Sequence, residues 1–327
     1  MKKSIITFYR KNKKIIFLIL RIIISVSLIA FLVNTQFKDI QTALIILKAA
    51  NKPLLLLSFS THAFGIWITA VRWKILLNTQ KVYLGTGTLT LSVMIGFFFN
   101  NFLPTSIGGD VFRTYDVAKK GKMPVGTSAS VILVERFSGV ISAATYATLA
   151  LFMGFTAIGG QSVIVPILIF FMITIILGFI IINPSVLRLG KLFNRFKFLK
   201  KLKEGLSNVY HTLLSFKQYK LVLINVLVLS FLLQFMVILN YYLAARALGI
   251  ELGLTAFIFI VPVVSTIAML PFSIGGIGIR ESSLAFILVV MGVTNEKAGL
   301  QSLLIFLMLI IVGIIGGIIY LVRPYFE

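Results

Sequence analysis

Two arginines occupy the same position in a short motif that occurs twice in this chain. The stretches LPTSIGGDVFR (103–113) and LPFSIGGIGIR (270–280) are identical at seven of eleven positions. In each, the arginine follows the second of two adjacent glycines by four residues, so Arg113 and Arg280 are equivalent. A guanidinium binds a phosphate or a carboxylate through two parallel hydrogen bonds. The two motifs therefore favour a site for an anionic group.

The other residues of the motif predict a break between two helices. Proline and paired glycines end a helix and allow a tight turn. The first amide groups of the returning half-helix then have no intrahelical partner and lie at the positive end of the helix dipole, which favours a bound anion. We expect the headgroup of an anionic ligand to bind at Ser106, Gly108, Gly109, Arg113, Ser273, Gly275, Gly276 and Arg280.

Nearby carboxylates offer a competing, structural interpretation of the same arginines. Asp110 and Asp116 are each three residues from Arg113, and Glu281 adjoins Arg280. Ion pairs within the membrane would neutralise both guanidinium groups, or the carboxylates would couple ligand movement to protons. Charged groups at this depth are costly and usually functional, so both interpretations stay open.

Four further polar residues are less specific. Glu135 and Arg136 lie near the cytoplasmic end of an apolar run and form either an interfacial pair or part of a lipid pathway. Asn100 and Asn101 precede the first motif and either line a cavity or cap the helix end. With two distant histidines, no cysteine and no nucleotide-binding or hydrolase motif, we expect no metal, no cofactor and no catalytic residue.

The composition predicts the elements that position these residues. Of 327 residues, 59% are hydrophobic and only 12% are charged, whereas soluble globular proteins are near one quarter charged. Several runs approach the 20 apolar residues that cross a bilayer as a helix. The chain is therefore predicted to be an all-α polytopic membrane protein. Its apolar runs are 15–33, 53–71, 85–103, 131–155, 163–182, 221–245, 254–270, 280–292 and 300–322.

The distribution of Lys and Arg predicts how these runs cross, because cytoplasmic loops carry an excess of both. Basic residues stand on both sides of the run 85–103, namely Arg72, Lys74 and Lys81 before it and Lys119, Lys120 and Lys122 after it. We interpret this run as one arm of a hairpin that enters from the cytoplasm, and 254–270 as one arm of a second hairpin that enters from outside. The prediction is six full transmembrane helices plus two re-entrant hairpins, with both termini in the cytoplasm of a cell-membrane protein.

The net charge of +22 fits the same arrangement without a nucleic-acid partner. Of the 31 Lys and Arg residues, 22 fall in the segments expected on the cytoplasmic side and five on the outer side. The long basic segment 183–220 is either an interfacial amphipathic helix or a solvated loop.

The offset of 167 residues between the two motifs extends beyond them and divides the chain into four parts. Residues 1–52 hold a basic segment, the first transmembrane helix and an outer loop, and 53–155 form the first repeat, with its hairpin tip at 104–109. Residues 156–220 hold a connecting span and a basic loop, and 221–327 form the second repeat, with its tip at 271–276. A single crossing between the repeats inverts the second one, as in many secondary transporters.

Three stretches in this order carry a resemblance to a known family: NNFLPTSIGGDVFR (100–113), ERFSG (135–139) and LPFSIGGIGIRE (270–281). The chain resembles the lysylphosphatidylglycerol synthase transmembrane-region family, also described as flippase-like integral membrane proteins. In its multiple peptide resistance factors, this region moves an aminoacylated phospholipid to the outer leaflet and a soluble C-terminal domain synthesises it. We expect no synthetase domain here, because the chain ends at Glu327, shortly after the last apolar run.

The resemblance implies that the chain translocates a lipid, and the motifs indicate a phosphate-bearing headgroup. Phospholipids, aminoacyl-phospholipids, glycolipids and polyprenyl-phosphate-linked lipids all remain candidates, with a separate lipid-synthesising enzyme as a possible partner. Two alternatives stay open: a secondary transporter of a small soluble anion, and a non-catalytic membrane scaffold for a lipid-modifying enzyme. A groove open to lipid favours the first reading, whereas an aqueous vestibule favours the anion transporter.

Overall fold

The computed structural model describes residues 23, 26–37, 39–102, 108–152, 172, 212, 214–268 and 276–323. Over these residues the chain forms helices and loops without a strand, which confirms the predicted all-α class. After a helical segment at Val26–Gln36, the helices are α2 (Ile40–Ala49), α3 (Lys52–Thr79), α4 (Thr86–Phe102), α5 (Gly108–Lys120), α6 (Val125–Phe152), the short 3₁₀ turn η4 (Phe216–Gln218), α10 (Lys220–Ala247), α11 (Leu254–Ala268), α12 (Ile279–Val290) and α13 (Asn295–Val322).

Among the described helices, α3, α10 and α13 are long and apolar enough to cross a membrane. Each has 28 residues, which corresponds to about 42 Å at 1.5 Å per residue and exceeds the ~30 Å hydrocarbon core. Helix α6 has the same length but carries Glu135 and Arg136 in its interior. The predicted connecting span at 163–182 and almost all of the basic segment 183–220 lie outside the described residues, so the count of six spans stays a prediction.

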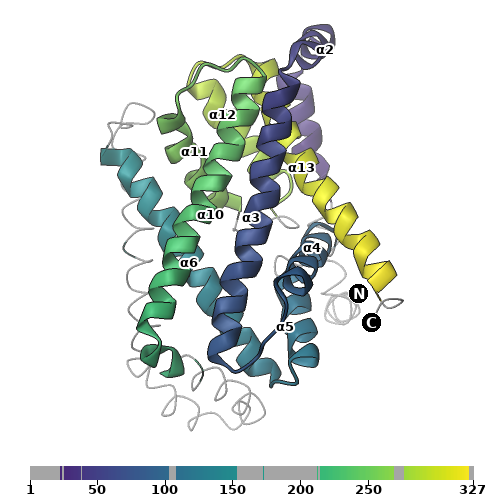
Figure 1. Ribbon diagram of the computed structural model, residues 1–327. Coiled ribbons are helices and arrows are strands. Elements are labelled where there is room, and N and C mark those ends of the chain that lie inside the picture. The colour runs from purple at the N-terminus through teal and green to yellow at the C-terminus, as the bar shows by residue number, and fades with distance from the viewer. Residues whose placement is uncertain are drawn as a thin grey trace, which may run out of the picture.

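Helices α3 and α10 pack side by side in opposite directions along most of their length (Figure 1). At one end, the amide of Asn51, just before α3, donates to the carbonyl of Ala247, the last residue of α10, over 2.9 Å. Further along, the Ser58 hydroxyl donates to the Asn240 carbonyl, and the Asn240 amide donates back to the Ser58 carbonyl. These buried bonds fix the register of the central helix pair.

Each long helix of this pair is followed by two shorter helices and another 28-residue helix (Figure 1). The pair α4 and α5 lies toward one end of the molecule, and the pair α11 and α12 toward the other. Helix α4 packs on α13, and α11 packs on α6, so each hairpin contacts the long helix of the other half. Most of both expected tips, namely 104–107 of 104–109 and 271–275 of 271–276, lies outside the described residues, and the inverted repeat stays a prediction.

Glycines allow the close crossing of α13 and α4. A Cβ on Gly316 would overlap the backbone carbonyl of Met94, and one on Gly317 would lie 2.7 Å from the Phe98 ring. Small residues at such crossings let helices approach without a hydrophobic driving force, as is typical in membranes.

Four helices end in the same cap. The second residue after the helix has a left-handed backbone, namely Lys81 (φ 60°) after α3, Lys122 (φ 47°) after α5, Gly249 (φ 69°) after α10 and Gly292 (φ 86°) after α12. In each case that residue and the next donate their amides to carbonyls of the last turn, which is the Schellman arrangement. The left-handed conformation costs a residue with a Cβ about 1 to 2 kcal/mol, and glycine avoids this cost.

Candidate functional site

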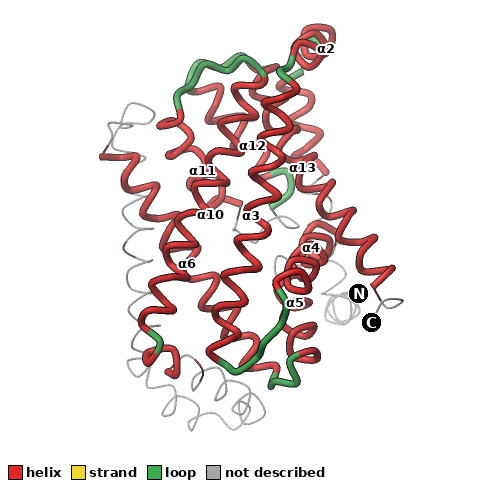
Figure 2. The backbone as a smooth tube through the Cα atoms, viewed as in Figure 1, coloured by secondary structure: helices red, strands yellow, loops and turns green. Residues whose placement is uncertain are grey.

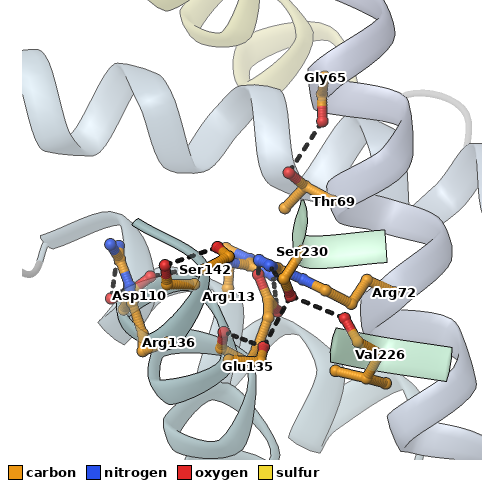
Figure 3. A network of polar contacts seen from close by, with 12 residues as sticks. Gly65, Thr69, Arg72, Asp110, Arg113, Glu135, Arg136, Ser142, Val226 and Ser230 are labelled. Carbon is orange, nitrogen blue, oxygen red and sulfur yellow. Dashed lines mark hydrogen bonds and ion pairs between the residues drawn. The ribbon is translucent and has the colours of Figure 1, made fainter. Parts of the chain in front are cut away.

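A buried carboxylate joins two arginines at the place where α3, α5 and α6 meet (Figure 3). Glu135 on α6 is 3% exposed; its Oε1 accepts from Arg72 Nη2 over 3.0 Å and its Oε2 from Arg113 Nη2 over 2.7 Å. Both guanidinium groups are buried as well. Because its three residues lie on three different helices, this bridge ties α5 and α6 to α3 of the central helix pair.

Further contacts extend the cluster on both sides. The Arg113 guanidinium carbon lies 4.1 Å from the centre of the Trp73 ring, a cation–π distance, and 3.6 Å separates Arg113 Nη1 from Asp110 Oδ1. Asp110 also accepts from Arg136 over 2.8 Å, and the Arg136 side chain is 49% exposed. The cluster thus runs from a buried centre to a surface arginine.

A hydroxyl pair connects the cluster to α10. Arg72 Nη1 donates to Ser230 Oγ over 2.8 Å, and Ser230 Oγ lies 2.9 Å from Ser138 Oγ on α6 (Figure 3). The Glu135 network, as we name it, comprises Arg72, Arg113, Glu135, Asp110, Arg136, Ser138 and Ser230.

The Glu135 network holds one more cation than carboxylate. Its three arginines face two acids, and the buried Nε atoms of Arg72 and Arg113 have no hydrogen-bond partner among the described residues. The surplus charge lies at the half-exposed Arg136, and the two buried Nε donors are unfavourable unless a hydrogen-bond acceptor approaches them. The arrangement is chemically suited to an anion that reaches the network from the side of Asp110 and Arg136.

At the first expected anion site, the Asn100 side chain already binds one of the amides that an anion would use. Helix α5 begins at Gly108, and the Gly109 amide donates to Asn100 Oδ1 over 2.8 Å, so Asn100 acts as a cap. Asn101 donates instead to the Leu309 carbonyl on α13 over 2.9 Å and contributes to packing. The expectation that all first amides of this half-helix are free is corrected at Gly109; Ser106 lies outside the described residues.

We expect Asn100→Ala to loosen the first turn of α5. Loss of a capping oxygen costs about 1 kcal/mol and leaves the Gly109 amide without its partner. Hydrogen–deuterium exchange should show faster exchange in a peptide covering 108–114, with unchanged exchange in α10. Asn101→Ala is the matched control and should leave that peptide unchanged; equal exchange in both variants would contradict the capping role.

The second motif is built differently from the first. Helix α12 begins at Ile279, so Arg280 lies in its first turn and not one turn into the half-helix as the motif predicted. Glu281, only 1% exposed, accepts from Arg280 Nη2 over 2.6 Å and from the Gly278 amide over 2.6 Å. Gly276 has a φ of +79° close to the end of α11, and Ser273 and Gly275 lie outside the described residues. Arg280 and Glu281 therefore form a cluster of their own.

Asp116 belongs to a third contact. It accepts from the Ser92 hydroxyl on α4 and from Arg323 Nη1 at the end of α13, the latter over 3.2 Å. Of the two aspartates considered as partners of Arg113, Asp110 lies beside it, whereas Asp116 pairs elsewhere.

Comparison with protein families gives a match over nearly the whole chain. The model of the lysylphosphatidylglycerol synthase TM region matches residues 18–317, which include both motifs and the Glu135 network. The chain belongs to this family. The resemblance drawn from the three sequence stretches is thereby confirmed, and with the three apolar 28-residue helices it identifies a multi-pass integral membrane protein.

One curated relative matches this chain over about half of its own length. It is the UPF0104 membrane protein MJ1595 of Methanocaldococcus jannaschii, 25% identical over 172 residues, which cover 51% of this chain and 50% of the relative. The chain therefore spans about half the length of that relative, whose name states a membrane location and no substrate.

Sequence reasoning missed part of the Glu135 network. Arg72 was assigned to a cytoplasmic loop, but α3 continues to Thr79 and places Arg72 inside it, 5% exposed. No sequence pattern indicates Ser230, or Trp73 beside the network, because each looks like an ordinary residue of an apolar helix. The location of Glu135 and Arg136 in one motif with Ser138 was the available hint, since a buried acid requires a cationic or hydrogen-bonding partner.

Proposed function

We propose that this protein is a lipid flippase that moves a phosphate-bearing lipid between the two leaflets, without catalysing a reaction. The observation that carries the proposal is the Glu135 network of a member of this membrane family, in which three arginines face two carboxylates and the surplus cation, Arg136, is half exposed beside the buried Arg113. A lipid phosphate supplies the missing negative charge, while its acyl chains stay among the apolar helix surfaces. Candidate headgroups are those of phospholipids, aminoacyl-phospholipids, glycolipids and polyprenyl phosphates.

Arg113 is the residue that exchanges partners in this mechanism. It binds Glu135 in the described state and turns one hydrogen-bonding edge to the phosphate when the lipid enters. Asp110 and Arg136 then form the polar entrance, because Arg136 is half exposed and paired with Asp110. Arg280, held by Glu281 in the other half, receives the phosphate in the second state, and the two inverted halves alternate in role.

The transfer of a fluorescent lipid tests this function. Full-length protein is reconstituted into vesicles with phosphatidylglycerol that carries a fluorophore on one acyl chain, and the loss of fluorescence to an impermeant quencher reports the outer leaflet. We expect Arg113→Gln with Arg280→Gln to lower the transfer rate at least tenfold, because each charge-assisted hydrogen bond contributes about 1.5 to 3 kcal/mol. Arg246→Gln, at an exposed arginine at the end of α10, is the matched control and should transfer at the wild-type rate.

Two other results would replace the proposal. Uptake of free inorganic phosphate by the same vesicles, without lipid transfer, identifies a transporter of soluble anions. If the folded protein shows neither lipid transfer nor anion uptake, the protein is a scaffold. Size-exclusion profiles of every variant establish that the protein is folded before rates are compared.

A further inference from the structure

Lysine stands in two helix caps where the backbone calls for glycine. Lys81 and Lys122 have the left-handed conformation that Gly249 and Gly292 have in the equivalent caps of the other half. The connections that contain the two lysines lie at one end of the molecule, and those that contain the two glycines lie at the other (Figure 2). Because the four caps have equivalent hydrogen bonds, the turn itself does not require a lysine. The two ammonium groups must be explained by something other than the fold.

For Lys122, the helix dipole is not a sufficient explanation either. A cation near a helix C-terminus is favourable, but α5 already has Lys119 and Lys120 in its last turn. Lys122 follows that turn and adds a third lysine to it. A turn with glycine, like those after α10 and α12, would satisfy the helix end without strain.

The two lysine caps lie against each other. A Cβ on Gly121 would be only 2.6 Å from Val82 Cγ1, so the residue before Lys122 packs on the residue after Lys81. Both lysines and Lys119 are exposed. The lysine patch, as we name Lys81, Lys119 and Lys122, thus presents three ammonium groups from two adjoining turns.

The surroundings of the lysine patch are those of a bilayer surface. The connections 80–85 and 121–124 contain no acidic residue, so nothing in these turns neutralises the lysines. Tyr83 is 76% exposed beside Lys81, and Tyr115 on α5 is 60% exposed. Exposed tyrosines with lysines are characteristic of the headgroup level of a membrane, where anionic lipids attract basic clusters.

We propose that the lysine patch binds the phosphate of an anionic phospholipid in the adjoining leaflet, at the base of the α4–α5 hairpin. This site is separate from the Glu135 network, and lipid binding there does not require transport. An anionic lipid held at this position lies next to the hairpin that carries Arg113, which concentrates anionic lipid beside the Glu135 network.

Native mass spectrometry of the detergent-purified full chain tests the site, with phosphatidylglycerol as the titrated probe. We expect Lys81→Gly with Lys122→Gly to weaken phosphatidylglycerol binding roughly 25-fold, at about fivefold for each lysine near an anionic surface. The midpoint of thermal unfolding without lipid should stay equal or rise, because glycine removes the backbone strain. Lys81→Asn with Lys122→Asn should weaken binding equally, since asparagine tolerates the left-handed conformation and carries no charge.

Three matched measurements separate this site from general charge effects. Lys81→Arg with Lys122→Arg should keep the affinity, and Lys48→Gln with Lys52→Gln, at the other end of α3, should leave it unchanged. Zwitterionic phosphatidylcholine should bind much more weakly to the wild type. The proposal is wrong if both neutral variants bind phosphatidylglycerol like the wild type, if the Lys48 and Lys52 variant loses as much, or if inorganic phosphate displaces the lipid and so identifies a soluble-anion site.

Discussion

Replacing Glu135 with Gln is expected to cost about 3 to 5 kcal/mol of stability, the largest effect of any single polar change in the described residues. The substitution keeps the shape of the side chain but removes the charge between Arg72 and Arg113, and two buried guanidinium groups then face each other uncompensated. Thermal unfolding of the detergent-purified protein should show a midpoint roughly 10 °C below that of the wild type.

A second substitution shows whether the loss comes from the unpaired charge. Adding Arg72→Gln to Glu135→Gln removes one of the two orphaned cations, so the double variant should be more stable than the sum of the single losses predicts. Arg323→Gln, which removes the separate ion pair with Asp116, should add independently to Glu135→Gln. A midpoint of Glu135→Gln within 2 °C of the wild type would show that the bridge does not hold α3, α5 and α6 together.

Gly316→Ala is expected to destabilise the protein by about 3 kcal/mol through backbone overlap alone. The added methyl group would meet the Met94 carbonyl and its carbon, which belong to the backbone of α4 and cannot rotate away. Helices α4 and α13 must then separate, and the Asn101 bond to the Leu309 carbonyl on α13 lengthens with them. The unfolding midpoint measured under the same conditions gives the size of the effect.

Gly87→Ala on α4 is the matched control, since a Cβ there meets nothing within 4 Å. It should leave the midpoint unchanged or raise it slightly, because alanine favours a helix over glycine. Equal losses in the two variants would mean that general helix disturbance, rather than the close crossing, governs the result.

The sequence predicted the helices and the family well, for identifiable reasons. Apolar runs near membrane-crossing length are strong signals, and α10 and α13 begin and end within a few residues of the runs 221–245 and 300–322. The ion pair of Arg280 with Glu281, which the competing structural interpretation expected, is present, because adjacent residues need no knowledge of the fold. Local periodicity and local neighbours were sufficient for these features.

The centre of the site required information that no local pattern contains. Arg72 looked like the first basic residue of a loop because it follows a run of apolar residues, and only the packing of α3 on α6 and α10 brings it to Glu135 and Ser230. The capping of Gly109 by Asn100 likewise depends on the crossing of α4 and α5. Lysines in left-handed caps could not be foreseen, since sequence patterns place glycine there.

The antiparallel seam between α3 and α10 determines which parts of the molecule are free to rearrange. Asn51 forms one contact with α10 at the start of α3, Ser58 a second about two turns further along, and Arg72 a third toward the other end. A shift of one helix along the other by a single residue, about 1.5 Å, breaks all three of these hydrogen bonds at once. We therefore expect the packing of α3 on α10 to stay unchanged during the proposed transport, and any movement to involve the shorter helices.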